Sequence, residues 1–337
     1  MNKTVKYLYL ICFILLSRAA SAQDLGSLIS EGNKLYDARD FKAAIEKYQE
    51  VIRAAPDNTA IRYKMAFSMY AAGRSGDALS QLQEVVKVSS SAAILSSSYQ
   101  LMGGIYDKMG SPVKAIESYQ KGIKTDSADH SLRYGLGLAY FRNRQYAKAE
   151  ESARAAIKLK PDHAGSMRLY ALVTFHQNKR APALLALCSF LRLDPAGPQA
   201  AEAYTNMQSI LKGGVLKEVP GVKIAAPGPE TIILNKAITT ALAEVGQRKY
   251  LVKPYLLAEQ LQAVFTAIGK VAEKQKGDPF FRTQLVPFYY KLGQTSHVPA
   301  FTSFITRHSD RSAAAWMADH PEQAQQFKDW MGSVKTE

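Results

Sequence analysis

The sequence predicts an all-α protein: a right-handed solenoid of about five helical hairpins with one capping helix, followed by an all-α C-terminal region. Two observations predict this fold class. A pattern of about 34 residues, with small and aromatic residues at fixed offsets, recurs between Leu25 and Gly197, and repeats of that length are typical of stacked helical hairpins. Beyond Gly197, apolar residues continue to recur every three to four positions, which is the period of an amphipathic helix.

Each repeat is expected to form two helices that pack closely, because two of its positions carry small residues where larger ones would strain the packing. These positions hold Gly32, Ala66, Gly103, Gly137 and Ala171 in the first helix and Ala44, Ala78, Ala115, Ala149 and Ala183 in the second. Pro56, Pro161 and Pro195 end the second helix of three copies, since proline cannot continue an α-helix. The other two copies carry Ser90 and Ser127 instead.

With these residues at these offsets, the repeats resemble the tetratricopeptide repeat family, and the resemblance covers about half of the chain. It implies that the first helix of each unit lines a concave face that binds a segment of another protein. Matching the positions of that face to this sequence predicts a partner-binding set of Tyr36, Tyr63, Phe67, Tyr70, Tyr134, Phe141, Arg142 and Phe175. Aromatic and arginine residues are enriched where interface energy concentrates. The alternative, that individual aromatic residues pack between neighbouring repeats, remains open.

One function of the family is not expected. Members that capture chaperone tails clamp a terminal carboxylate with lysine, asparagine and arginine side chains. Asn33 and Lys64 match that clamp, but Ile29, Ser97 and Leu101 stand where its other basic residues belong. The resemblance therefore implies a protein partner of another kind.

The first residues predict export. Lys3 and Lys6 precede the apolar run Tyr7 to Leu16, and small residues follow at 20–22, which is the order of a cleaved signal peptide over residues 1–22. A membrane anchor is the competing interpretation, but such a run is half of the roughly twenty residues that cross a bilayer. The mature chain is thus expected to be exported, to the bacterial periplasm or beyond it, with no transmembrane segment.

Charge and cysteine content limit the other function classes. The formal charge is +14, and it falls to +11 when the basic residues of the signal peptide are removed. The lysines and arginines are scattered and no nucleic-acid-binding motif is present, so no nucleic-acid partner is expected. Cys188 would be the only thiol left, and it is predicted to be a half-buried structural residue.

The rest of the chain predicts further helices. Residues 198–212 are expected to cap the solenoid, and glycine and proline at 213–229 predict a linker. The predicted organisation is a signal peptide over 1–22, a solenoid over 23–213, a linker over 214–229 and a helical C-terminal domain over 230–337.

No motif of a hydrolase, phosphate loop, zinc site or redox dithiol is found, so no catalytic residue, cofactor or metal is expected. We therefore expect a non-enzymatic exported scaffold of the bacterial cell envelope that binds a protein or peptide through its aromatic groove. Two alternatives stay open. The C-terminal region could be an enzymatic or ligand-binding domain that the repeats position, or it could fill the groove itself.

Overall fold

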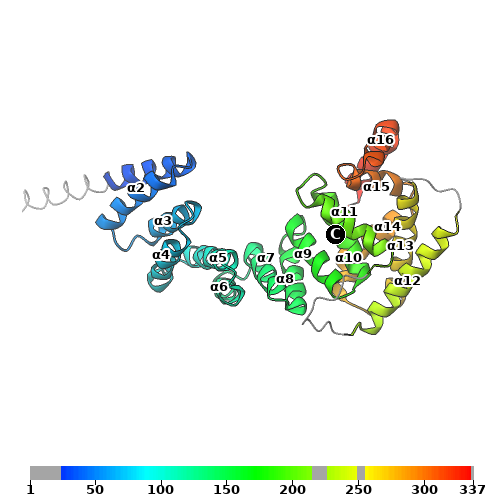
Figure 1. The fold of residues 1–337 in the computed structure, drawn as a ribbon, viewed down its shortest axis with the longest axis horizontal. Coiled ribbons are helices and arrows are strands. Elements are labelled where there is room, and N and C mark those ends of the chain that lie inside the picture. Colours follow the sequence, from blue (N-terminus) through cyan, green and yellow to red (C-terminus); the bar gives the residue numbers. More distant parts are fainter. Residues whose placement is uncertain (1–23, 215–225, 249–254, 335–337) are drawn as a thin grey trace, which may run out of the picture. The chain divides into compact units, whose positions relative to one another are not determined.

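The computed structural model describes residues 24–214, 226–248 and 255–334, so the predicted signal peptide and most of the predicted linker lie outside the described residues (Figure 1). Every regular element in the described ranges is a helix and none is a strand, which confirms the all-α fold class. The described residues form two compact units, which divide between Ala139 and Tyr140.

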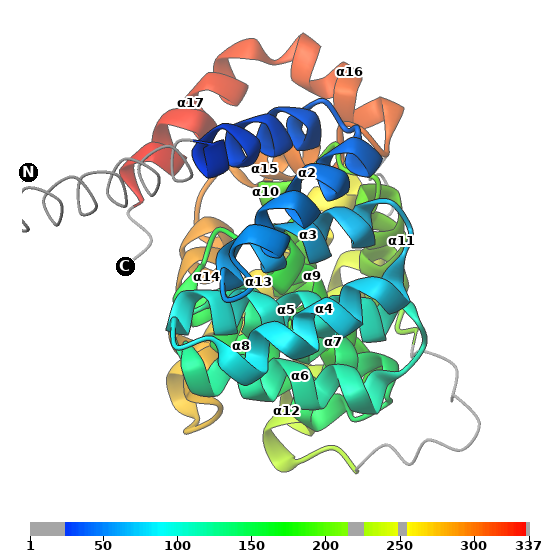
Figure 2. The same cartoon turned by 90° about the vertical axis from the view of Figure 1, so that its left-hand side faces the viewer.

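The described part of the first unit is a succession of helical hairpins (Figure 2). Its elements are a helix over residues 24–37, α2 (Phe41–Ala54), α3 (Thr59–Ala71), α4 (Ser75–Val88), α5 (Ala92–Lys108), α6 (Pro112–Thr125) and most of α7 (His130–Arg142). The helices α3 and α4 pack together, as do α5 and α6, and α3 also contacts α5. First helices of neighbouring repeats therefore lie side by side and form one face.

Local signals fix where these helices begin. Asp40, Asn58 and Ser91 precede α2, α3 and α5, and each side chain accepts a hydrogen bond from a backbone N–H of the following first turn. Such caps satisfy N–H groups that have no partner within the helix. Gly73 and Gly110 adopt φ of 81° and 69° between the helices of a hairpin, in the left-handed region that glycine enters without strain.

Small residues let buried tyrosines fill the spaces between helices. A Cβ atom on Gly32 would lie 2.7 Å from the Tyr48 ring, and one on Gly103 would lie 2.7 Å from the Tyr119 ring. Ala66 and Ala78 are fully buried in the same core. The repeat spacing thus places small residues where the close packing of the hairpins requires them.

The second unit contains the remaining repeats and the C-terminal helices. Its further elements are α8 (Tyr146–Leu159), α9 (Ala164–His176), α10 (Arg180–Leu193), α11 (Ala200–Leu211), α12 (Pro229–Gly246), α13 (Tyr255–Lys274), the π-helical turn η1 (Phe281–Leu285), α14 (Val286–Gly293), α15 (Val298–Thr306), α16 (Arg311–Asp319) and α17 (Pro321–Ser333).

Helix α10 is the centre of this unit. Every residue from Arg180 to Leu191 is buried, because α9, α11, α12, η1 and α15 all pack against it. A helix that is apolar on all sides is stable only when it is enclosed. The predicted boundary at 214–229 therefore does not coincide with the division between the compact units, since the C-terminal helices build their core around the last repeat hairpin.

Polar contacts join the same elements. The buried Arg180 donates through Nη2 to the carbonyl of Ile210 at 2.7 Å and through Nη1 to Oγ1 of Thr239 at 3.0 Å. Cys188 is fully buried rather than half-buried, and burial raises the pKa of its thiol. Both residues are thus part of the interior of the second unit.

An ion-pair network connects α8 to the segment before η1. The buried carboxylate of Glu150 accepts from Lys179 at 2.6 Å and from Gln177 at 2.7 Å, and it pairs with Arg154. Nη1 of Arg154 in turn donates to Oδ1 of Asp278 at 3.0 Å. Burial would raise the pKa of the Glu150 carboxyl, but the charges of Lys179 and Arg154 outweigh burial and hold this pKa below its usual range.

Candidate functional site: an aromatic surface on the repeats

An aromatic cluster lies on the first unit, where the helix over residues 24–37 meets α3. The ring centroid of Tyr36 lies 5.6 Å from that of Phe41 and 5.8 Å from that of Phe67, both edge-on, and the Tyr63 ring lies 6.5 Å from Phe67. These separations lie in the range that aromatic pairs favour. All four side chains remain partly exposed, so the cluster presents ordered aromatic surface to a partner.

The cluster forms one wall of a pocket of about 460 Å³. The pocket is lined by Asn33, Tyr36, Asp37, Tyr48, Tyr63, Lys64 and Phe67. These residues come from the helix over 24–37, from α2 and from α3, so the pocket belongs entirely to the first unit.

Polar groups at this pocket are held in place by one another. Oδ1 of Asn33 accepts from the hydroxyl of Tyr48 at 2.9 Å and from Nζ of Lys64 at 3.0 Å. Tyr48 is buried, and burial raises the pKa of its hydroxyl to about 12, so it stays protonated and donates. The pocket therefore combines an aromatic wall with an exposed ammonium group whose position is fixed.

Tyr70 and Tyr134 continue the aromatic surface along the first unit. Nζ of Lys108 lies 5.2 Å from the centroid of the Tyr70 ring, a cation–π contact. Tyr119 lies beside both tyrosines: burial raises its pKa to about 12, and Tyr70 and Tyr134 add smaller contributions. Both predicted residues are partly exposed on α3 and α7.

The second unit repeats the motif of Tyr36 and Phe41 at equivalent repeat positions. The ring centroids of Phe141 and Tyr146 are again 5.6 Å apart. His176 stacks on Tyr146 at 4.8 Å, and burial lowers the pKa of its imidazole, so His176 is neutral at pH 7 and behaves as a third aromatic ring. Arg142 follows on the same turn and is exposed.

One predicted partner-binding residue is not on the surface. Phe175 is 2% exposed and belongs to the core that α9 forms with α10, so it cannot contact a partner. The structure brings Tyr36, Tyr63 and Phe67 together, whereas Phe141 and Arg142 lie in the other unit. Tyr48 lines the pocket of the first unit and Tyr146 packs on Phe141 in the second, but both are absent from the predicted set, although both recur at fixed offsets in the repeat.

Two other features are absent from the described ranges. No group of three or more histidine, cysteine, aspartate or glutamate side chains there could hold a metal ion. Among the same residues, no helix is both long enough and apolar enough to cross a membrane.

Comparison with known proteins identifies the repeats. Residues 35–92 match a family model described as tetratricopeptide repeat, and residues 103–164 and 134–201 match a second model with the same description. Heat shock protein STI1 of Saccharomyces cerevisiae is 28% identical over 186 residues, which cover 54% of this chain and 30% of that protein. The small glutamine-rich tetratricopeptide repeat-containing protein 2 of Mycosarcoma maydis is 28% identical over 112 residues, which cover 33% and 31% of the two chains.

The chain thus spans about a third of the length of these curated relatives. Among solved structures, a tetratricopeptide repeat protein from Parabacteroides merdae covers 84% of this chain and 99% of its own at 13% identity, with a TM-score of 0.48. YrrB, described as a repeat protein with an unusual peptide-binding site, covers 53% and 90% at 15% identity, with a TM-score of 0.45. Neither structure adds to the family assignment at these scores.

Proposed function

This chain belongs to the tetratricopeptide repeat family, and from that membership we propose that it is a non-enzymatic scaffold that binds a protein partner through the aromatic surface of its first unit. The observation that carries the proposal is the pocket beside Tyr36, Tyr63 and Phe67. Ordered aromatic side chains that stay partly exposed are the residues on which interface energy concentrates.

The pocket also indicates what the partner presents. An apolar side chain of the partner fits against the aromatic wall, and a carbonyl or carboxylate oxygen next to it can accept from Lys64. The exposed carboxylate of Asp37 stands at the same pocket and favours a donor on the partner. We therefore expect a peptide segment with one apolar anchor flanked by polar groups.

The test is retention of a partner by the purified chain. Tyr63→Ala with Phe67→Ala removes two rings of the aromatic wall, and this double variant is expected to bind at least 30-fold more weakly, since truncating two buried interface aromatics costs about 2 kcal/mol or more. The matched control is Tyr255→Ala, which removes a tyrosine that is 41% exposed in the second unit. The proposal fails if the control and the double variant retain the same proteins to the same extent.

We also propose that the chain is exported and acts in the bacterial cell envelope. The support is the order of charged, apolar and small residues at 1–22. The expected mature chain begins at Gln23, and N-terminal sequencing of the protein recovered from the periplasmic fraction tests this. Recovery of uncleaved chain from the cytoplasm would refute the proposal.

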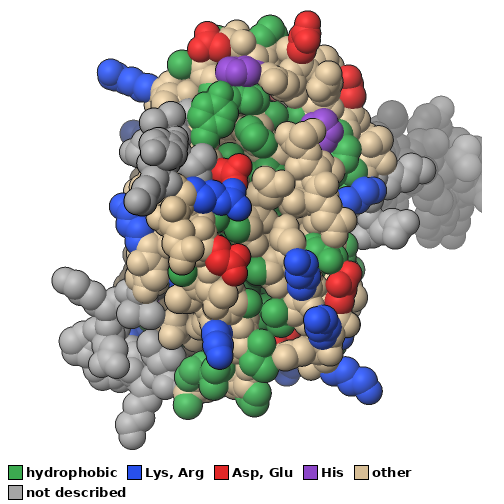
Figure 3. Space-filling view, turned by 90° about the vertical axis from the view of Figure 1, so that its right-hand side faces the viewer, with side chains coloured by type: hydrophobic (Ala, Val, Ile, Leu, Met, Phe, Trp, Pro, Cys, Tyr) green, Lys and Arg blue, Asp and Glu red, His purple; other side chains and the backbone are tan. Residues whose placement is uncertain are grey.

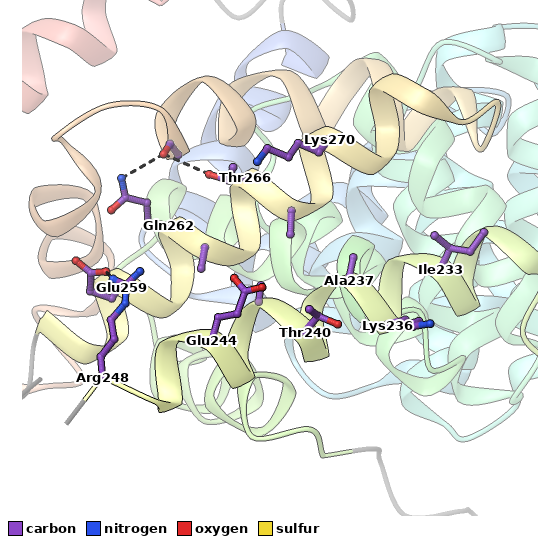
Figure 4. Close-up of a pocket in the computed structure, with 14 residues that line it drawn as sticks. Ile233, Lys236, Ala237, Thr240, Glu244, Arg248, Glu259, Gln262, Thr266 and Lys270 are labelled. Carbon is purple, nitrogen blue, oxygen red and sulfur yellow. Dashed lines mark hydrogen bonds and ion pairs between the residues drawn. The ribbon is translucent and has the colours of Figure 1, made fainter.

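One observation favours a second candidate function, a ligand-binding role of the second unit. Figure 3 shows a face of this unit on which hydrophobic side chains reach the surface among charged ones. A groove of about 750 Å³ runs between α12 and α13, and Lys236, Glu244 and Lys270 line it (Figure 4). The interior of this unit is filled by packed aromatic rings, among them Phe265 and Tyr289, so a ligand would bind at the groove.

A further inference from the structure

The positive charge of the chain is concentrated in one unit. Residues 24–139 contain 14 lysines and arginines against 13 acids, whereas residues 140–337 contain 26 against 16. The repeats of the first unit are therefore nearly neutral, and the second unit carries almost all of the excess. An excess of positive charge of this size attracts anionic partners. Because the excess lies on the second unit, we expect such partners to bind there.

Two isoleucines on α12 are exposed next to each other. Ile232 is 54% exposed and Ile233 is 37% exposed, within the first two turns of the helix. Elsewhere in the described ranges, the large hydrophobic side chains with comparable exposure occur singly along the sequence. The next residue, Leu234, is only 3% exposed and anchors the opposite face of α12. The two isoleucines therefore point away from the core that holds this helix.

Exposed lysines lie on α12 and α13 near these isoleucines. Ile233, Lys236 and Lys270 line the same end of the α12–α13 groove, while Arg248 pairs with Glu259 at the other end (Figure 4). Lys274 lies one turn beyond Lys270 on α13. Among the described residues, no acid forms an ion pair with Lys236, Lys270 or Lys274, and all three are exposed. We call Ile232, Ile233 and these three lysines the α12–α13 tip.

Glu230 and Glu273, which lie close to the tip in sequence, make contacts within the chain. The carboxylate of Glu230 accepts the backbone N–H of Asp278 at 3.0 Å, a contact that also holds the end of α13 beside the first turn of α12. Glu273 accepts from the hydroxyl of Tyr290 at 3.2 Å. The three ammonium groups are thus available for anions outside the chain.

We propose that the α12–α13 tip binds the surface of an anionic phospholipid membrane, with Ile232 and Ile233 entering the interface and Lys236, Lys270 and Lys274 contacting the head groups. Exposed apolar side chains next to basic ones are the combination that peripheral membrane binding uses. An acidic polymer would use the lysines but would leave the isoleucines in water. This role is independent of partner binding by the first unit.

The test is sedimentation with vesicles. The chain from Gln23 keeps every described helix and omits the apolar run Tyr7 to Leu16, which would bind lipid by itself. If the tip binds anionic lipid, the chain should sediment with vesicles of phosphatidylcholine and phosphatidylglycerol, and this binding should weaken as salt is added. Little binding to vesicles of phosphatidylcholine alone is expected. No binding to the anionic vesicles at low salt would overturn the proposal, as would equal binding to both kinds of vesicle.

Charge variants locate the lipid contact. Lys236→Gln, Lys270→Gln and Lys274→Gln together are expected to lower the partition coefficient about 100-fold, since each lysine near an anionic surface contributes about fivefold. The matched control changes the exposed Lys148, Lys158 and Lys160 to glutamine, which removes the same charge from the same unit. Equal losses in the two triple variants would show attraction by net charge alone and would overturn the tip as the site.

Apolar variants separate a lipid from an acidic polymer. Ile232→Ser with Ile233→Ser is expected to lower vesicle binding at least tenfold, because two side chains no longer leave water. Met109→Ser with Val113→Ser is the control, since these residues are 55% and 58% exposed in the first unit beside Lys108 and Lys114. Unchanged binding of the isoleucine variant, with circular dichroism showing that it is folded, would overturn the membrane proposal.

Discussion

Arg154 and Asp278 lie 124 residues apart in the sequence, yet Nη1 of Arg154 donates to Oδ1 of Asp278 at 3.0 Å. The contact joins a repeat helix, α8, to the segment that leads into η1. Arg154 also pairs with the buried Glu150, so a single guanidinium forms ion pairs with two carboxylates. Ion pairs, as well as the apolar core around α10, therefore hold the C-terminal helices against the repeats.

Removing this guanidinium is expected to destabilise the second unit. Arg154→Met should lower the free energy of unfolding by about 2 kcal/mol, because it leaves a partly buried Asp278 without its ion pair. Urea unfolding measures the change. The control is Arg74→Met, whose pair with Asp77 is about half exposed and should contribute little. If the two variants lose the same free energy of unfolding, the ion-pair network does not stabilise the second unit.

The pH dependence of stability should report on Glu150. Its pKa in the folded chain is lowered, so the stabilisation is fully present above the pKa of the unfolded chain, about 4.3, and is lost as pH falls through the lower folded value. Urea unfolding at about pH 7, 5 and 3 should show a smaller acid loss in Glu150→Gln than in the parent. The variant should also be less stable than the parent at neutral pH. Identical acid losses would show that other carboxyls govern the decline.

The close packing of Gly32 on Tyr48 predicts an unusual response to alanine. Alanine normally stabilises a helix relative to glycine, but a Cβ on Gly32 would lie 2.7 Å from the Tyr48 ring. Gly32→Ala is therefore expected to destabilise the first unit by about 1–3 kcal/mol through overpacking. Gly26→Ala, in the same helix with no atom within 4 Å of the added carbon, should be neutral or stabilising. Thermal unfolding of the two variants compares them, and equal melting temperatures would contradict the close contact.

Cleavage between α11 and α12 should not release two separate pieces. The helices after the cut, α12, η1 and α15, pack against α10, which lies before it. With a specific protease site inserted after Val219, the two fragments are expected to elute together by gel filtration and to separate only in denaturant. Independent elution in native buffer would show that the C-terminal region is a domain of its own.

The repeats could be predicted because their signals are local. Positions such as Gly32, Ala66 and Ala78 recur at a fixed spacing, and all three are buried at helix contacts. The aromatic surface follows from the same register, so Tyr36, Tyr63 and Phe67 could be placed near one another. Phe175 lies in the same register but is buried, because the C-terminal helices enclose the hairpin to which it belongs.

The packing of the C-terminal helices around the last repeat hairpin could not be predicted in the same way, because no repeated pattern in the C-terminal region indicates it. Arg154 and Asp278 are too far apart in sequence for their contact to be inferred from spacing. The sequence of α10 does indicate that this helix is enclosed. The stretch from Arg180 to Leu193 is apolar on every side, whereas a helix in an open solenoid keeps a polar face. That pattern predicts a helix covered from several directions, although it does not say which elements cover it.

The proposed function depends most on contact between a partner protein and the aromatic pocket of the first unit. The most direct measurement is site-specific photocrosslinking in cells, with p-benzoylphenylalanine in place of Phe67 and, as the control, in place of Val88, which is 62% exposed outside the pocket. We expect one discrete adduct at Phe67 that is missing at Val88 and that weakens when Tyr63→Ala is added. No adduct at Phe67, or the same adducts at both positions, would contradict a partner-binding role of the pocket.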